Sequence, residues 1–321
     1  MTNDIFILAE HLNGKLSDGS YEMVGLAKRL AGEIGGRAIA VLLGSGIPSL
    51  AGMLGSDSVL YVDDPALADF NPEAYARVLS ALVKEHNPRL LMIGSTSMGM
   101  DLAAGLSVTT GLPHIAYVNG LQAQGETLVV TSQIYGGKIQ AEAVPDGEAC
   151  IVSCLAGVFA ADAGRIEQAT PVESMASPVP LGDLRVKFVR LIQPAGGDVD
   201  ITQQPMLVSI GRGIGGPENI ELAQELADAL GAAVSASRPV TDAGWLHKTR
   251  QVGKSGLTVK PKVYLALGIS GAPEHLEGMR GAELIIAVNT DPQAPIFGVA
   301  HYGATCDMLD LMPSLTEKIR G

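Results

Sequence analysis

The stretch SGAPEHLEG, residues 270–278, places small residues, a proline and a histidine between two strongly apolar runs. Small residues at positions 270–272 leave the backbone N–H groups uncovered where a strand passes into a helix. Backbone N–H groups at such a transition bind phosphate well. The segment therefore indicates a phosphate-binding loop, to which Glu274 and His275 add a carboxylate and an imidazole.

A second glycine-rich segment, GRGIGG at residues 211–216, matches the pattern G-x-G-x-x-G between a predicted strand and a predicted helix. A dinucleotide pyrophosphate binds in this context. A nicotinamide dinucleotide also needs an acidic residue about 20 residues further on, which binds the ribose. This chain has Ser237 and Arg238 there, and Arg212 adds a cation to the glycine loop. These residues favour a flavin dinucleotide over NAD.

Apolar periodicity predicts that strands and helices alternate around these loops. In the first half the predicted strands are IFILAEH, AIAVLLGS, VLYVDD and RLLMIGSTS, and the predicted helices cover residues 18–36 and 72–87. In the second half KVYLALGI and ELIIAVN are predicted strands on either side of a short helix, PEHLEGM, and a helix ends the chain. Such alternation is typical of parallel sheets covered by helices on both faces.

The predicted fold class is α/β, with two doubly wound domains. The N-terminal domain, residues 1–195, has additional antiparallel strands that we expect between 113 and 160. Residues 196–204 are predicted to be a linker, because 162–205 is rich in proline, glycine and polar residues around one strand-like run, LRVKFVRLI. Residues 205–321 are predicted to form a Rossmann-like parallel sheet.

The composition is that of a globular protein and limits its partners. Hydrophobic residues make up 47% of the 321 residues and charged residues 17%, which excludes a disordered chain. The formal net charge is −12 and no basic run offsets it, which argues against a nucleic-acid-binding surface. The hydrophobic excess indicates parallel strands buried on both faces, or a large subunit interface.

The sequence gives no sign of a membrane span, a metal site or an export signal. The longest nearly apolar stretch, ACIVSCLAGVFAA at residues 149–161, is too short to cross a bilayer and is predicted to be a buried strand. No pair among the three cysteines has metal-site spacing, and Cys150 and Cys154 share a strand face that we expect to line the core. The N-terminus enters a strand within a few residues, so we expect a cytoplasmic protein.

Residues 205–321 resemble the C-terminal domain of the electron-transfer flavoprotein alpha subunit. The segments that carry the resemblance are GRG with PEN, SRPVTDAGW, QVG, YLALGISGA with a following His, IIAVNTDPQAPIF, and YG with a later Asp. The N-terminal half resembles the same family through LAEH, AVLLGSG, DDPALADFNPEAYA, GSTSMGMDLA and YGGK. The resemblance implies that the C-terminal domain holds FAD in an extended pose and that a beta subunit completes the site.

The resemblance also implies a role for individual residues. Arg212 is expected beside the phosphates, Arg238 against the isoalloxazine ring and the Ser255 hydroxyl opposite N5. His275 is expected near O2, where a hydrogen-bond donor would stabilise the reduced flavin. Asn289 is expected, with Asp307, at the ribityl and adenosine end. The complete predicted set is Arg212, Ser237, Arg238, Gln251, Val252, Gly253, Lys254, Ser255, Ser270, Gly271, Ala272, Pro273, Glu274, His275, Asn289 and Asp307.

The chain departs from the family in both cofactor loops. Lys254-Ser255 replaces a usual Gln-Thr pair, and Pro273-Glu274 replaces an aliphatic-Gln pair. The N-terminal motif has Met100 where an arginine is usual. The resemblance implies a beta subunit, acyl-CoA dehydrogenase-type donors and a quinone-linked or other redox acceptor as partners, but the two added charges leave redox tuning open.

Two other functions are compatible with the residues. One is an NAD-binding dehydrogenase or a deoxyhypusine-synthase-like nucleotide-binding enzyme, against which the missing ribose-binding acid counts. The other is a degenerate scaffold without flavin, given the altered loops. The sequence also leaves open whether the protein takes part in an electron-bifurcating complex. An electron carrier needs no catalytic base or nucleophile of its own, and it is the function that we expect.

Overall fold

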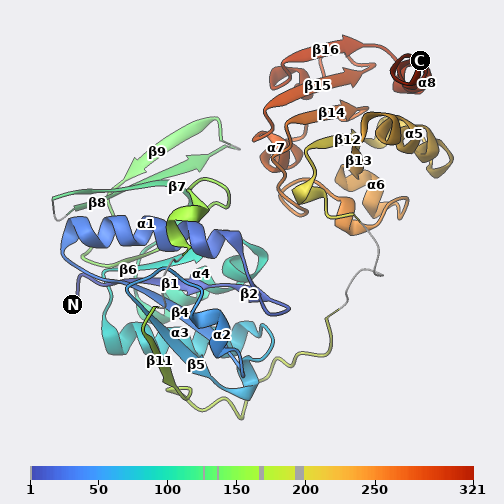
Figure 1. The fold of residues 1–321 in the computed structure, drawn as a ribbon. Coiled ribbons are helices and arrows are strands. Elements are labelled where there is room, and N and C mark those ends of the chain that lie inside the picture. Colours follow the sequence, from blue (N-terminus) through green and yellow to red (C-terminus); the bar gives the residue numbers. More distant parts are fainter. Residues whose placement is uncertain (1, 126, 136, 166–169, 192–198) are drawn as a thin grey trace. The chain divides into compact units, whose positions relative to one another are not determined.

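Parallel strands with apolar residues on both faces form the centre of each half of the chain (Figure 1). The chain divides into two compact units, Met1–Arg190 and Leu191–Gly321. The computed structural model describes residues 2–125, 127–135, 137–165, 170–191 and 199–321.

The described residues of the first unit form a nine-stranded mixed sheet in the order β11-β5-β4-β1-β6-β10-β7-β8-β9, and a separate short hairpin. Its helices are α1 (Asp18–Ile34), α2 (Pro48–Ala51), α3 (Pro72–His86) and α4 (Ser97–Thr110). Its strands are β1 (Ile5–Ala9), β2 (His11–Leu12), β3 (Lys15–Leu16), β4 (Ala38–Gly44), β5 (Ser58–Asp63), β6 (Leu90–Gly94), β7 (His114–Gln124), β8 (Thr127–Ile134), β9 (Ile139–Ala143), β10 (Cys150–Cys154) and β11 (Val172–Met175).

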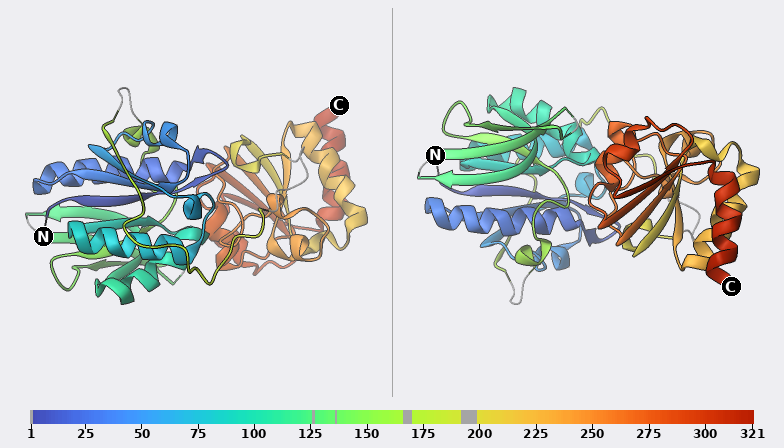
Figure 2. Two further views of the ribbon diagram at one scale, coloured as in Figure 1. Left: turned by 90° about the horizontal axis from the view of Figure 1, so that it is seen from below. Right: turned by 90° about the horizontal axis from the view of Figure 1, so that it is seen from above.

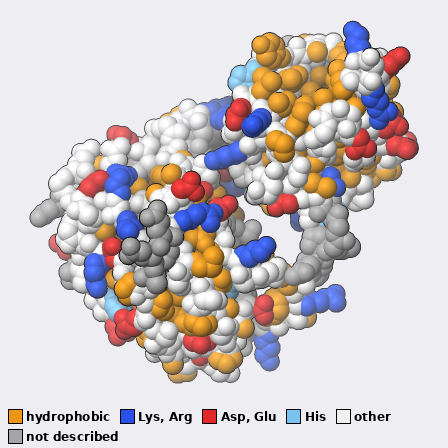
Figure 3. Space-filling view, viewed as in Figure 1, with side chains coloured by type: hydrophobic (Ala, Val, Ile, Leu, Met, Phe, Trp, Pro, Cys, Tyr) orange, Lys and Arg blue, Asp and Glu red, His pale blue; other side chains and the backbone are white. Residues whose placement is uncertain are grey.

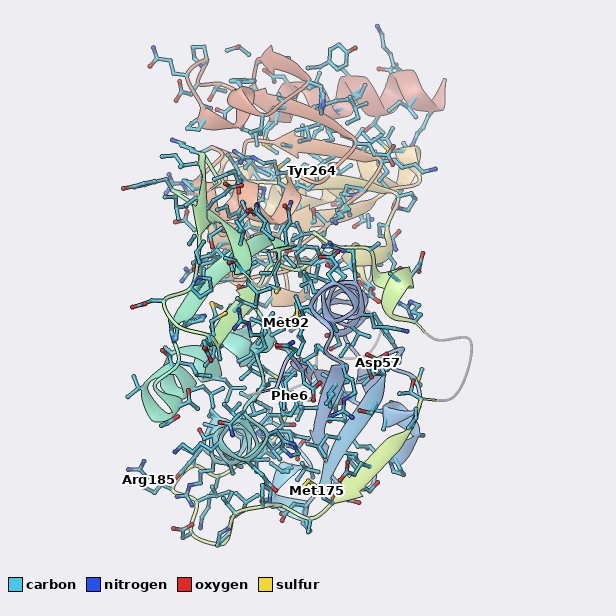
Figure 4. All side chains as sticks on the ribbon, turned by 90° about the vertical axis from the view of Figure 1, so that its left-hand side faces the viewer. Phe6, Asp57, Met92, Met175, Arg185 and Tyr264 are labelled. Carbon is cyan, nitrogen blue, oxygen red and sulfur yellow. The ribbon has the colours of Figure 1, made fainter. Side chains whose placement is uncertain are left out.

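This sheet is buried on both faces, as the hydrophobic excess predicts. Alternate residues of a strand point to opposite faces. Accordingly Ile7 of β1 joins a core with α1, whereas Phe6 joins a second core with α3 and α4. Met92 of β6 lies in the core with α1, and Figure 4 labels it together with Phe6. Cys150 and Cys154 are buried in that same core, which confirms their predicted position.

The prediction that residues 113–160 form antiparallel strands is correct for β7, β8 and β9 but wrong for β10. β7 pairs with β8, and β8 with β9, in antiparallel register, whereas β10 lies parallel to both β6 and β7. All five residues of β10 are buried. A continuous apolar strand of this kind fits the middle of a parallel sheet, where both faces are covered, better than a half-exposed edge.

The strand-like run LRVKFVRLI is not a strand over residues 184–191, and residue 192 lies outside the described residues. The segment is held instead by α3, because Glu73 accepts hydrogen bonds from the backbone N–H groups of Arg185 and Val186. Asn71 at the start of α3 donates to the carbonyl of Val186. Apolar and polar residues alternate around Val186, which is typical of a strand. Hydrogen bonds with side chains at the start of α3 satisfy the backbone of this segment instead of a neighbouring strand. The sheet gains β11 instead, which pairs with β5.

The described residues of the second unit form a five-stranded parallel sheet in the order β13-β12-β14-β15-β16. This arrangement, together with the mixed sheet of the first unit, confirms the predicted α/β fold class. The strands are β12 (Met206–Ile210), β13 (Ala233–Ala236), β14 (Val263–Leu267), β15 (Leu284–Asn289) and β16 (Tyr302–Thr305). The helices are α5 (Ile220–Leu230), α6 (Arg238–Asp242), α7 (Pro273–Met279) and α8 (Met308–Arg320).

Helices cover both faces of this second sheet. Leu226 of α5 and Met312 of α8 share one core, and both views of Figure 2 show α5 and α8 side by side. Leu276 and Met279 of α7 belong to the core on the other face. Gly231 ends α5 in a left-handed conformation, with a φ of 63°, as its position after the periodic apolar residues predicts.

The predicted limits of 1–195, 196–204 and 205–321 remain a prediction, since residues 192–198 lie outside the described part of the chain. In the residues that the structure describes, no helix has both the length and the apolar character needed to cross a bilayer. Within the same residues no cluster of three or more His, Cys, Asp or Glu side chains is placed to bind a metal ion.

Candidate functional site

All sixteen predicted site residues lie at or after the carboxyl end of a strand in the second sheet. The strands are parallel, so these ends meet at one edge. The chain leaves β12 for β13 on one side and then returns to β14 on the other side, which makes β12 and β14 a topological switch point. Ligands of open α/β sheets bind at this position, where successive connections diverge to opposite faces.

Glycines bring the loops after β12 and β14 into direct contact. The N–H of Gly213 donates to the carbonyl of Gly268 at 3.3 Å. A Cβ at Gly211 would collide with that same carbonyl, and a Cβ at Gly213 would lie 2.9 Å from the Cα of Gly268. Only glycine allows the two backbones to approach this closely. Arg212, between the two glycines, is exposed at the rim.

The loop after β13 presents an exposed cation. Ser237 is buried, and its N–H donates to the carbonyl of Ile210 at 3.0 Å, which ties this loop to the end of β12. Arg238 begins α6 and is exposed, and its Nε lies 3.0 Å from an Oδ of Asp242 one turn further on. The guanidinium therefore has a carboxylate neighbour on its own helix.

Residues 251–256 belong to the same connection as Arg238, between β13 and β14, and contact the loop after β14. The N–H of Val252 donates to the carbonyl of Ala236, and the N–H of Lys254 donates to the carbonyl of Glu274 at 2.7 Å. Gly253 has a φ of 135°, and a Cβ there would lie 2.9 Å from the Glu274 carbonyl oxygen. The two loops that carry the added charges are therefore adjacent through their backbones.

Gln251 orders the hydroxyl group in this loop. Its side-chain amide donates to Ser255 Oγ at 2.9 Å, and its amide oxygen accepts from Thr241 Oγ1 at 2.7 Å. Gln251 is buried, whereas Ser255 is exposed. The Ser255 hydroxyl is thus held by an acceptor contact and keeps its own proton available to a ligand.

The loop after β14 contains the small residues that suggested phosphate binding. Gly271 has a φ of 85°, and a Cβ there would collide with the backbone N of Ile296. The N–H of Ile296 donates to the carbonyl of Ser270. Ser270, Ala272 and also Pro273 are exposed, whereas Gly271 between them is buried against Ile296.

His275 is a buried member of the predicted set, with 6% of its surface exposed. Its Nε2 lies 2.9 Å from the hydroxyl of Tyr264, and its Nδ1 is buried without a hydrogen-bond partner among the described residues. Burial lowers the pKa of His275 to about 4, and the backbone of Val252 opposes this shift. The imidazole is therefore neutral near pH 7.

The last two predicted residues stabilise the loops after β15 and β16. The side chain of Asn289 donates to the carbonyl of Ile269 at 2.9 Å and so fixes the loop after β14. Asp307 caps α8 by accepting from the N–H of Leu309 at 2.8 Å. The adjacent Met308 packs against Gly268, where a Cβ would collide with its sulfur. All five connections are therefore linked at the switch point.

Sequence reasoning missed three residues that are linked to the predicted set by hydrogen bonds or an ion pair. Tyr264, Ser209 and Asp242 each bond directly to a predicted residue or to its partner. Tyr264 and Ser209 lie on buried strands, where the apolar sequence pattern indicates only core residues. Asp242 stands four residues after Arg238, a spacing that brings side chains together on a helix and could have identified it.

The arrangement fits an extended dinucleotide. The glycine contacts at Gly211, Gly213 and Gly268 leave backbone close to the rim, where a pyrophosphate needs it. The unpartnered Nδ1 of His275 is a polar atom that a ligand edge could satisfy. The end of β13 supplies Ser237 and Arg238 where a nicotinamide site needs an acid, so the donor set suits a flavin better than NAD.

Comparison with known proteins agrees with this geometry. Residues 5–180 match the electron transfer flavoprotein domain, and residues 200–280 match the electron transfer flavoprotein FAD-binding domain. The electron transfer flavoprotein subunit alpha of Thermoanaerobacterium thermosaccharolyticum is 37% identical over 99% of this chain and 98% of its own length. That of Megasphaera elsdenii is 37% identical over 98% of this chain and 96% of its own length.

A third relative is the acryloyl-CoA reductase electron transfer subunit beta of Anaerotignum propionicum, which is 35% identical over 99% of this chain and 95% of its own length. The matched domains include the switch point between β12 and β14, at which the predicted residues converge. The domain matches and the near-complete coverage of these relatives show that the chain belongs to the electron transfer flavoprotein alpha subunit family.

Proposed function

We propose that this chain is the FAD-binding subunit of a two-subunit electron carrier that takes electrons from acyl-CoA dehydrogenase-type enzymes and passes them to a quinone-linked or other redox acceptor. The observation that carries the proposal is the convergence of five loops at the switch point of the second unit. The relative named for acryloyl-CoA reductase supports an enzyme that acts on an acyl-CoA as a redox partner. We expect the complex in the cytoplasm.

The residues of this chain divide the work of holding the cofactor. Bound FAD supplies the electron transfer itself, since side chains do not accept electrons in this way. The backbone at Gly211 and Gly213 receives the phosphates, with Arg212 at the rim. Arg238 supplies a cation near the ring, and the Ser255 hydroxyl, held by Gln251, supplies a donor. His275, which is neutral and hydrogen-bonded to Tyr264, faces the pyrimidine edge.

We assign the beta subunit to the N-terminal domain, residues 1–195. Support comes from the β8–β9 hairpin and the residue that follows it, where the apolar side chains of Ile134, Tyr135, Ile139 and Val144 are exposed. Exposed apolar groups on a strand at the end of a sheet favour pairing with another chain. Residues 205–321 then carry the FAD. Figure 3 also shows hydrophobic side chains gathered on the second unit over β14 to β16, where Tyr302 is exposed.

The experiment is co-purification with the cognate beta subunit followed by anaerobic reduction. We expect a yellow complex whose flavin absorbance is bleached by an acyl-CoA together with catalytic amounts of its dehydrogenase, and restored by a quinone-linked acceptor. NADH is the comparison reductant. Bleaching by NADH alone would favour the dehydrogenase alternative or a bifurcating complex. A colourless complex that does not take up added FAD would contradict the proposal.

A further inference from the structure

A chain of buried hydroxyl groups leads from the centre of the second sheet to His275. The Tyr264 hydroxyl donates to Ser209 Oγ at 2.6 Å and lies 2.9 Å from His275 Nε2. Ser209 and Tyr264 are completely buried, and Figure 4 labels Tyr264 within this sheet. Burying polar groups in such a core costs free energy unless they form hydrogen bonds with one another. The three groups therefore form a defined hydrogen-bond network.

With the hydrogen bonds of this chain in one direction, the protons define one state of the imidazole. The Tyr264 hydroxyl has one proton, and it is used in the bond to Ser209. The Tyr264 oxygen must therefore accept from Nε2–H of His275. Because the imidazole is neutral, its other nitrogen, Nδ1, then carries a lone pair and no proton. In this state His275 presents an acceptor at the atom that has no partner among the described residues.

The same three groups allow the opposite state without any change of net charge. If Ser209 donates to Tyr264, then Tyr264 donates to Nε2, and the neutral imidazole carries its proton on Nδ1. His275 then presents a donor. The two states differ only in the direction of two hydroxyl bonds and in the position of one proton on the ring.

We propose that Ser209 and Tyr264 are positioning residues that set the tautomer of His275, and thereby decide whether Nδ1 offers a lone pair or a proton to the flavin. The flavin part of this inference rests on the proposed function. The pyrimidine edge of a flavin carries both an N–H donor and carbonyl acceptors, and reduction adds negative charge beside those acceptors. A histidine whose tautomer can reverse fits both redox states, whereas a fixed tautomer fits one.

Ser235 supplies both a matched control and a necessary second substitution. It is completely buried on β13, opposite Ser209 in the register, and its Oγ makes no hydrogen bond among the described residues. It lies near enough to Tyr264 to oppose the rise in the pKa of that phenol caused by burial. Ser235→Ala alone leaves the Tyr264–Ser209 bond in place. Ser209→Ala alone leaves Ser235 as a substitute acceptor, so the decisive variant is Ser209→Ala/Ser235→Ala.

The first measurement is the tautomer of His275 from imidazole ¹⁵N chemical shifts in the flavin-free full chain. Histidine-selective labelling leaves six histidines, and His275→Gln assigns the signal. In the double serine variant Tyr264 retains only Nε2 as an acceptor among the described residues. We expect the ratio of Nδ1–H to Nε2–H forms to rise about tenfold, the effect of one redirected hydrogen bond. Ser235→Ala is expected to leave the ratio unchanged.

The second measurement is the midpoint potential of FAD in the complex with the beta subunit. We expect a more positive potential in Ser209→Ala/Ser235→Ala, because a fixed donor favours the reduced flavin. Adding the same two substitutions to Tyr264→Phe is expected to change nothing further, because the relay is already broken. A simple packing defect would act in both backgrounds.

The outcomes are separable. An unchanged tautomer ratio in the double serine variant overturns the relay whether or not flavin binds. A changed ratio with an unchanged potential overturns the tuning of the flavin by this relay. Failure of every variant, and of the parent, to bind FAD would contradict the proposed function, while the tautomer measurement in the flavin-free chain would still decide the relay.

Discussion

Arg238 and Asp242 form an exposed pair on one turn of α6, and we expect this pair to determine how much positive charge reaches the cofactor. Arg238→Ala removes the cation and is expected to lower the midpoint potential of FAD, on the order of tens of millivolts, and to weaken FAD retention. Asp242→Asn removes the competing carboxylate and is expected to shift the potential the other way. Spectroelectrochemistry of both variants measures whether the two midpoint potentials shift in these opposite directions.

Arg320→Ala is the control for this experiment. Arg320 is an exposed arginine at the far end of α8, roughly 18 Å along the helix from Met308 at a rise of about 1.5 Å per residue. Its removal should leave the potential within error. Equal shifts in Arg238→Ala and Arg320→Ala would mean that only the total charge of the chain matters.

Lys254 and Glu274 carry the two charges that depart from the family pattern, and their backbones are joined by a 2.7 Å hydrogen bond. Lys254→Gln is expected to make reduction of the flavin harder, and Glu274→Gln is expected to make it easier. The double substitution should restore the potential to near its original value, because opposite charges at adjacent positions largely cancel. Parental potentials in both single variants would show that solvent screens these side chains from the ring.

Glu10 predicts a pH dependence of stability in the first unit. It follows β1, is buried, and accepts from Thr96 Oγ1 at 2.8 Å. Burial raises its pKa from 4.5 to about 6, against the opposing bond from Thr96. A raised carboxyl pKa means that ionisation destabilises the fold. The penalty is absent below pH 4.5, grows between pH 4.5 and about 6, and is complete above that, where it amounts to about 2 kcal/mol.

Glu10→Gln keeps an acceptor for Thr96 and cannot ionise. Its free energy of unfolding relative to the parent chain is therefore expected to rise by about 2 kcal/mol from pH 4.5 to pH 7. Urea denaturation at the two pH values measures this difference. A constant offset between variant and parent would show that Glu10 does not titrate in this range.

At the scale of elements, one carboxylate fastens a loop to α1. Glu22 of α1 is buried and accepts hydrogen bonds from the backbone N–H groups of Gly157, Val158 and Phe159 at 2.9 to 3.2 Å. Glu22→Gln places an amide N–H group against these donors and is expected to cost about 1–3 kcal/mol of unfolding free energy. Glu85→Gln, at an exposed position of α3, is the control and should change stability little. Equal losses would argue against a specific role for the loop.

At the scale of the whole molecule, the exposed β8–β9 hairpin predicts dependence on a partner. We expect a heterodimer with the beta subunit that buries more than roughly 2,000 Å², the lower range of obligate interfaces. Ile139→Lys places a charge on β9 and should weaken the complex at least about tenfold, since a desolvated lysine opposes binding. Val108→Lys, at an exposed position of α4, should not. Sedimentation velocity with and without the beta subunit measures both.

The sequence by itself determined most strands and helices of the two sheets, although LRVKFVRLI was wrongly predicted to be a strand, and it predicts which loops carry the cofactor residues. Glycine at 211, 213 and 271 could be interpreted without coordinates, because only glycine tolerates such backbone proximity or a positive φ. The position of the sixteen predicted residues at or after the ends of parallel strands also follows from alternation alone, since parallel strands end at one edge. The types of the residues and their order along the chain are sufficient for both inferences.

Only the tertiary structure decided which strands are neighbours and which buried residues serve the site. The apolar run of β10 does not specify its partners, because pairing depends on long-range contacts; the fold places it between β6 and β7. Tyr264 and Ser209 resemble ordinary core positions, since a sequence pattern records burial but not the 2.6 Å and 2.9 Å bonds that link them to His275. Those bonds join residues 11 and 55 positions apart, a separation that only folding removes.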